Sequence, residues 1–196
     1  MNLEYITPNV DYMSASAHKI GGPKGTGMLY AKKGTPLLPH IFGTQENGLR
    51  GGTENVIGIV GFGEACKQYY EHIYEWNQHV MELSSHMRDR VLDEIQGARL
   101  NGRVFPRLAG NLNFSFDGIN GEELMTMLDM NGICVSSGSA CNSSSGQPSH
   151  VLMALGLTKE QADSSIRISI SHENNMKEIN YAVDVLKETV DELRRK

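Results

Sequence analysis

A stripe of apolar residues that recurs every three or four positions dominates the middle of the chain. Its members are Ile59, Phe62, Cys66, Tyr69, Ile73, Trp76, Val80, Leu83, Met87, Val91 and Ile95. This spacing is typical of one face of an α-helix, and at 1.5 Å per residue such a helix is roughly 55 Å long. A coiled coil has similar spacing, but aromatic residues and a cysteine at the seam count against it. We therefore predict a helix over residues 53–97 that links two domains.

The segments on either side of this helix differ in pattern. Residues 1–52 contain two strand-like stretches, "VDYMSASA" and "GTGMLYA", separated by the Gly/Pro-rich turn "HKIGGPKG" and followed by a long ordered loop. Residues 98–196 alternate strand and helix patterns, which predicts a small α+β domain. Strands are expected at 111–116, 132–136 and 166–170, and helices at 121–130, after Ser149 as N-cap to a stop at Gly156, and from 176 to the end.

Composition narrows the function classes. The 196 residues carry a net charge of −5, which argues against nucleic acid or an acidic membrane as the main partner. The sequence shows no apolar run of transmembrane length and no start typical of a signal peptide. Three cysteines, an odd number at wide spacing, do not form a disulfide framework and suit a reducing cytoplasm. We expect a cytoplasmic protein.

The segment "VSSGSACNSSSGQPSH", residues 135–150, places Cys141 in a polar loop with nothing nearby to bury it. An exposed thiol invites oxidation and attack on electrophiles, so this one suits a chemical role. The alternative is an accidental surface thiol in a linker. Cys66 on the helical stripe and Cys134 in a predicted strand are expected in the core. A zinc site of Cys134, Cys141 and His150 lacks the usual paired close spacing.

Lys19 lies in the turn between the first two predicted strands, beside Ser16 and His18. Its amine can form a Schiff base with a carbonyl compound, and the neighbouring hydroxyl and imidazole can bind phosphate. The alternative is a solvated surface charge. Thr53 follows several glycines at the start of the long helix, where it can bind an anion or simply cap the helix.

Arg167 interrupts the otherwise apolar strand "IRISI". A guanidinium in such a strand needs an anion, and its planar fork matches a carboxylate. The partner is either an internal Asp or Glu or the carboxylate of a substrate.

Three long segments together resemble one family: "SASAHKIGGPKGTGMLY", "TQENGLRGGTENVIGIVGFGEA" and "SSGSACNSSSGQPSHVLMALGL", with "IRISI" after them. They are similar to the C-terminal half of a cysteine desulfurase, a pyridoxal 5′-phosphate (PLP) enzyme of the class V aminotransferase fold that supplies sulfur for iron–sulfur cluster assembly. The resemblance implies an α/β to α+β chain: a remnant of the PLP-dependent transferase large domain, a linking helix and a small C-terminal domain.

The resemblance also implies roles for particular residues. Lys19 would hold PLP, Ser16 and His18 would bind its phosphate, and Thr53 would reach the phosphate of the neighbouring subunit's cofactor in a homodimer. Two further roles concern L-cysteine: Arg167 would hold its carboxylate, and Cys141 would take its sulfur as a persulfide, leaving L-alanine. The acceptor of that sulfur would be a protein such as an iron–sulfur scaffold.

The chain departs from the family in length. Members are roughly twice as long, and the half before Lys19, which carries further cofactor contacts, is absent from these residues. Three interpretations stay open, an engineered fragment, a split-gene product or a truncated relative, and a complementary N-terminal half is one candidate partner. The resemblance therefore implies that these 196 residues alone are inactive. Two alternatives stay open: a non-catalytic module for dimerisation or partner binding, and a selenocysteine lyase or another class V transaminase.

Overall fold

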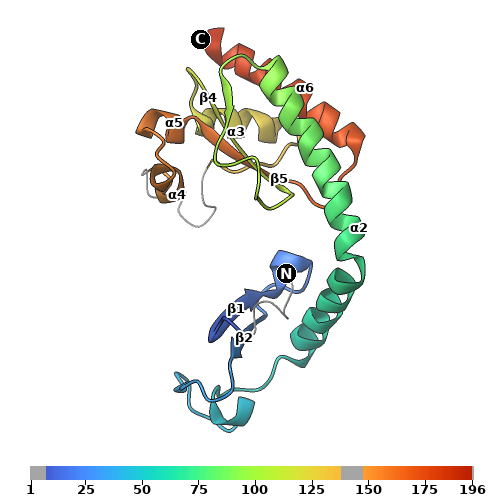
Figure 1. Ribbon diagram of the computed structural model, residues 1–196, viewed down its shortest axis with the longest axis vertical. Helices are drawn as coiled ribbons and strands as arrows, with labels where there is room; N and C mark the ends of the chain where they lie inside the picture. The colour runs from blue at the N-terminus through green and yellow to red at the C-terminus, as the bar shows by residue number, and fades with distance from the viewer. Residues whose placement is uncertain (1–7, 138–147, 196) are drawn as a thin grey trace. The chain divides into compact units, whose positions relative to one another are not determined.

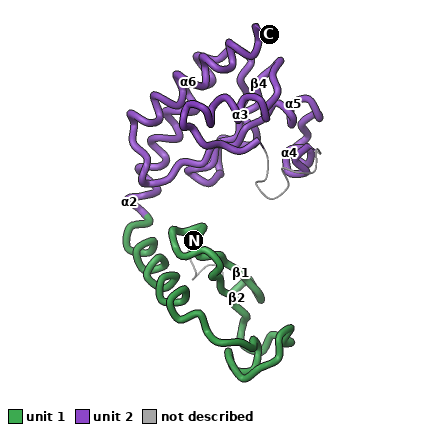
Figure 2. The backbone as a smooth tube through the Cα atoms, turned by 180° about the vertical axis from the view of Figure 1, so that it is seen from behind, with its two compact units in different colours: residues 1–73 green, residues 74–196 purple. Residues whose placement is uncertain are grey.

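The computed structural model describes residues 8–137 and 148–195. The chain forms two compact units, residues 1–73 and 74–196 (Figures 1 and 2). Their boundary falls inside helix α2, Val56–Glu94, so each unit contains part of this helix. The helix begins three residues later and ends three residues earlier than the predicted span 53–97. Within the described ranges, no helix is both long and apolar enough to cross a membrane.

The N-terminal unit is built on a two-stranded antiparallel sheet. Strand β1, Tyr12–Ser16, pairs with β2, Gly27–Ala31. The connection is more structured than the predicted reversal, because it contains a 3₁₀ turn, η1, Ala17–Ile20. A second 3₁₀ turn, η2, Glu46–Gly48, lies in the long loop before α2. The two strands and the loop therefore lie where they were predicted, whereas the two 3₁₀ turns, η1 and η2, were not predicted.

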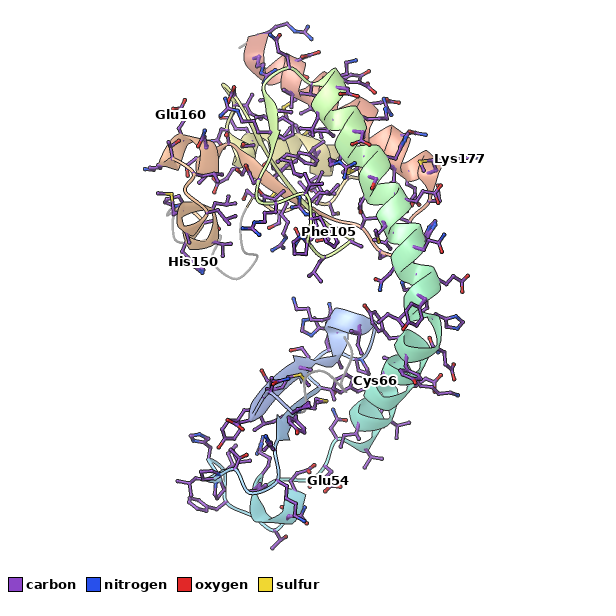
Figure 3. The ribbon with its side chains drawn as sticks, in the orientation of Figure 1. Glu54, Cys66, Phe105, His150, Glu160 and Lys177 are labelled. Atoms are coloured by element: carbon purple, nitrogen blue, oxygen red, sulfur yellow. The ribbon has the colours of Figure 1, made fainter. Side chains whose placement is uncertain are left out.

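The first part of α2 packs against the β1–β2 connection through two glycines. A Cβ atom on Gly58 would lie 2.2 Å from Thr26 Oγ1, and one on Gly61 would lie 2.7 Å from Pro23 Cγ. Side chains other than hydrogen therefore do not fit at this contact. The apolar stripe is only partly covered here, since Ile59 is 47% exposed. Cys66 is also exposed (Figure 3), so its predicted core position is wrong.

The C-terminal unit is built on a three-stranded antiparallel sheet in the order β3–β4–β5: Ala98–Leu100, Asn111–Phe116 and Ser165–Ser169. Three helices supply the rest of its core: the second part of α2, α3, Gly121–Met130, and α6, Met176–Arg195. The core contains Val80, Leu83, Met87, Val91, Ile95, Leu112, Phe114, Phe116, Leu124, Leu128, Ile166, Ile168, Ile170, Ile179, Val183, Leu186, Val190 and Leu193. The second half of the apolar stripe, from Val80 to Ile95, therefore packs into the core as predicted.

Polar contacts hold α2 against α6. Arg90 bonds to Glu94 on its own helix, Nε to Oε1 at 2.6 Å, and to Asp184 on α6, Nη2 to Oδ1 at 2.8 Å. His86 Nε2 and Asn180 Oδ1 lie 2.7 Å apart. The hydrogen bond from Arg90 lowers the pKa of Glu94, and both acidic partners raise the pKa of Arg90. The two helices are therefore joined by charge as well as by apolar packing.

Two short helices complete this unit: α4, His150–Ala154, and α5, Lys159–Asp163. Ser149 is the N-cap residue of α4, and Gly156, with φ of +88°, ends the following turn as predicted. Helix α5 and the short strand β3 were not predicted. The predicted strand at 132–136 is wrong, because only a single bridge, Ser136 to Arg167, forms there.

Candidate functional site

Strands β4 and β5 are apolar on one face and polar on the other. Phe114 and Ile166 lie in the core, whereas the alternate positions carry amide, hydroxyl and guanidinium groups. On the polar face, the antiparallel register sets Asn111 opposite Ser169, Asn113 opposite Arg167 and Ser115 opposite Ser165. Directly opposed residues of an antiparallel pair point to the same face of the sheet. Arg167 therefore shares its face with a row of neutral polar side chains.

A cavity of about 330 Å³ lies on this face. Its walls come from strands β4 and β5, from the 101–108 connection and from helix α4 with its flanks. The lining residues are Asn101, Gly102, Arg103, Pro106, Arg107, Leu108, Asn111, Asn113, Ser149, Val151, Leu152, Leu155 and Arg167. Three of them are arginines, and none is Asp or Glu. The cavity therefore favours an anion that has a small apolar part.

Arg167 is held by its backbone while its side chain makes no ion pair with a described residue. Its N–H donates to Ser136 O at 2.6 Å, and its own carbonyl accepts from Ser136 N–H at 3.0 Å. The first of the two predicted partners, an internal carboxylate, is therefore not found within the described ranges. The second, a carboxylate from a bound molecule, remains as the group that matches this guanidinium.

Arg107 adds a second positive charge to the cavity wall. Its Nη2 donates to Asn101 O at 3.2 Å, while Nε and Nη1 are buried without a hydrogen-bond partner. Burial, and then the nearby charge of Arg88, lower the pKa of Arg107. Since an arginine side chain does not lose its proton in proteins, the group still carries its charge at neutral pH.

The second candidate group lies in the N-terminal unit. Ser16 ends β1, and His18 and Lys19 lie in η1, with Gly21 in the left-handed conformation directly after that turn. All three side chains are exposed. These residues place an amine, an imidazole and a hydroxyl within four positions, which fits PLP. The amine can form a Schiff base with the carbonyl carbon of PLP, and the other two groups can bind its phosphate.

Thr53 does not start the long helix. It lies in an irregular, exposed stretch, and α2 begins only at Val56. Asn55 provides the cap, since its Oδ1 accepts a hydrogen bond from Gly58 N–H at 3.1 Å. The capping alternative for Thr53 is therefore wrong, because the Thr53 hydroxyl is not used to cap α2.

The cysteines are distributed differently from the prediction. Cys141 lies outside the described residues. Cys134 is exposed rather than in the core, with Sγ 3.9 Å from Asp129 Oδ1. Across the described ranges, no three His, Cys, Asp or Glu side chains come together as a metal site. Lys19 belongs to the N-terminal unit and Arg167 to the C-terminal unit.

Several residues of the cavity escaped sequence reasoning, among them Asn101, Arg107 and Asn113. The signal for Asn113 was present in the alternation of "NLNFSF", whose polar positions mark one face of a strand. Asn101 carried no such signal, because β3 has only three residues and the connection after it is irregular.

The chain matches the aminotransferase class-V family over residues 1–182, and it belongs to that family. The curated cysteine desulfurase IscS of Dictyoglomus turgidum is 43% identical over 186 residues, which is 94% of this chain and 47% of that protein. The chain thus spans about half the length of the curated relatives it matches.

Solved structures of NifS-like proteins have the same fold as this chain. A NifS-like protein superimposes with a TM-score of 0.85 at 36% identity. The match covers 94% of this chain and 47% of the chain of the NifS-like protein. A NifS-like protein from Rickettsia africae gives a TM-score of 0.83 at 30% identity, covering 93% and 48%. These likenesses confirm the mixed α/β to α+β fold class.

Proposed function

We propose that this chain is the C-terminal half of a PLP-dependent cysteine desulfurase, which converts L-cysteine to L-alanine and keeps the sulfur as a persulfide on Cys141. The observation that carries the proposal is Arg167, a guanidinium without an acidic partner in the described chain, in a cavity whose lining has no Asp or Glu. The names of the relatives support it, since the curated relatives that the chain matches at 43% identity are called cysteine desulfurase IscS.

Each proposed residue does a distinct task. Arg167 binds the carboxylate of L-cysteine, Lys19 carries the cofactor and moves the proton of the substrate α-carbon, and Ser16 and His18 bind the cofactor phosphate. When bound, PLP supplies the electron sink that this chemistry needs. Cys141 then attacks the substrate sulfur as a thiolate: a sulfur–sulfur bond forms, the carbon–sulfur bond breaks, and the carbon takes up a proton to become the methyl group of L-alanine.

The partners follow from the same chemistry. We propose that the persulfide passes to a sulfur-acceptor protein such as an iron–sulfur scaffold, in a reducing cytoplasm where a free thiol survives. Thr53 is proposed to reach the phosphate site of a second copy, which makes the active form a homodimer. The remaining cofactor contacts are proposed to come from a complementary N-terminal half, so the 196 residues alone do not turn over L-cysteine.

The test supplies that half. The chain is co-expressed with the part of the Dictyoglomus turgidum relative that precedes its matched segment, then given PLP and L-cysteine, and both L-alanine and the mass of the Cys141 peptide are measured. We expect L-alanine and one added sulfur atom on Cys141 in the complex, and neither product from the chain alone.

Three variants sharpen this experiment. Arg167→Gln should raise KM for L-cysteine strongly, whereas Arg103→Gln, which removes an exposed guanidinium from the same cavity, should change KM little. Cys141→Ser should abolish the persulfide. No product from the complex, or a persulfide that survives Cys141→Ser, would contradict the proposal.

A further inference from the structure

The residue directly opposite Arg167 in the sheet is Asn113. Cβ atoms of directly opposed residues in antiparallel strands lie about 4.5–5.5 Å apart on the same face. Both residues also line the cavity. A group bound by the Arg167 guanidinium is therefore within reach of the Asn113 side chain.

A chain of hydrogen bonds fixes which end of the Asn113 amide is left free. It starts at the backbone carbonyl of Gln161, which can only accept, so Ser165 Oγ donates its one hydrogen there, at 2.6 Å. Ser165 Oγ must then accept at its second contact, which makes the atom of Asn101 at 3.1 Å its Nδ2. The backbone carbonyl of Gln161 can only accept a hydrogen bond, and through Ser165 it fixes which end of the Asn101 amide is Nδ2.

The orientation of the Asn101 amide in turn fixes the orientation of the Asn113 amide. The second hydrogen of Asn101 Nδ2 goes to Asn113 Oδ1 at 2.7 Å, and Asn101 Oδ1 accepts from Ser115 Oγ at 3.2 Å. Asn101 is 7% exposed, and Ser115 and Ser165 are 3% and 0% exposed, so water does not compete for these bonds. Asn113 thus turns its oxygen toward Asn101, and its Nδ2 group makes no hydrogen bond with a described residue.

The cavity therefore holds two neighbouring donor groups that make no hydrogen bond with a described residue: the guanidinium of Arg167 and the amide NH₂ of Asn113. We propose that Asn113 donates a second hydrogen bond to the substrate carboxylate held by Arg167, and that Asn101 is the positioning residue that keeps the donor end of Asn113 toward it. This inference rests on the proposed function, and it adds a neutral donor that selects a carboxylate over its amide or ester.

The test uses the full chain, with L-alanine as an unreactive carboxylate probe and L-alaninamide as the matched probe without a carboxylate. Binding is followed through the ¹H–¹⁵N signals of the asparagine side chains. L-Alanine should shift the Asn113 amide signal in a saturable way, and L-alaninamide should not.

Asn113→Asp is the decisive variant, because it keeps an oxygen for Asn101, replaces the free donor end with a second oxygen and adds one negative charge opposite Arg167. Loss of a hydrogen bond to a charged group should weaken L-alanine binding about tenfold or more. Asn111→Asp is the matched control, since it adds the same charge two residues along the same face of β4. Two residues along a strand is about 7 Å, within one Debye length, so we expect Asn111→Asp to weaken L-alanine binding to some extent but clearly less than Asn113→Asp. The emission of Trp76, in the same unit, checks that each variant is folded.

The outcomes separate this inference from the function on which it rests. If Arg167→Gln abolishes L-alanine binding and Asn113→Asp leaves it unchanged, or if both Asp variants weaken it equally, the role of Asn113 is wrong and the proposed function stands. If L-alanine does not shift the Asn113 signal at all, the inference is overturned. Failure of Lys19 to take PLP would instead overturn the proposed function, and it would leave this titration unaffected, because Lys19 lies in the other unit.

Discussion

Replacing Asn101 with alanine should destabilise the C-terminal unit more than any other polar change on the cavity face. The Asn101 side chain bonds to Asn113 at 2.7 Å, to Ser165 at 3.1 Å and to Ser115 at 3.2 Å. Asn101→Ala removes all three bonds at once. It leaves two buried hydroxyl groups that were bonded to the lost side chain, on Ser115 and Ser165.

The size of the effect follows from these contacts. A hydrogen bond between neutral groups contributes about 0.5–1.5 kcal/mol net, and a buried polar group left without a partner costs about 1–3 kcal/mol. Ser165 keeps its bond to Gln161 O, so its hydrogen stays paired and only its acceptor is lost. We therefore expect the free energy of unfolding to fall by about 2–4 kcal/mol.

The assay is urea unfolding followed by fluorescence. Trp76 is the single tryptophan of the chain and stacks on His172 in the C-terminal unit, with ring centroids 3.7 Å apart. Its emission therefore reports on this unit. Asn111→Ala is the control, because the same residue type on the same face has no side-chain hydrogen bond to a described residue. A loss below about 1 kcal/mol for Asn101→Ala, or an equal loss for the control, would show that the hydrogen bonds of Asn101 do not stabilise this unit.

Three further outcomes follow from exposure and charge. Cys66 and Cys134 are exposed, so both should react with a maleimide in the native chain, as peptide mass mapping can show; protection of either one would contradict the structure. The pKa of Glu94 is lowered from its ordinary 4.5 by Arg90, so this pair stabilises the fold above that pH and the contribution disappears as the pH falls through the lowered pKa. Glu94→Gln should therefore cost about 0.3–1 kcal/mol at pH 7 and nothing at the acid end, by urea unfolding at each pH; an equal cost at both would rule this out. Leu29, 54% exposed on a two-stranded sheet, should promote self-association, so Leu29→Lys should shift sedimentation toward the monomer, and an unchanged profile would count against that view.

Sequence reasoning succeeded where burial follows a regular pattern. The alternation in β4 and β5 and the apolar stripe from Val80 to Ile95 both mark faces that a core must cover, and the structure covers them. The same stripe failed at Ile59 and Cys66, because the described part of the N-terminal unit covers Phe62 and leaves those two side chains exposed.

The site was predicted only in part, for physical reasons. Arg167 stood out because a charge interrupts an apolar strand, whereas Asn113 is neutral and its meaning depends on pairing with a strand more than fifty residues away. Thr53 was wrong as a cap because Asn55 supplies the same bond closer to the helix. No local pattern shows that Asn101, directly after β3, will share hydrogen bonds with Ser115 on β4 and Ser165 on β5.

We propose Lys19 as the cofactor lysine of a class V enzyme, and covalent labelling of this chain tests that role. The chain is mixed with PLP, reduced with borohydride and mapped by peptide mass, beside Lys19→Arg and the matched variant Lys24→Arg from the same connection. We predict the reduced adduct on Lys19, lost in Lys19→Arg and kept in Lys24→Arg. An adduct spread equally over the surface lysines, or none on Lys19, would contradict the account.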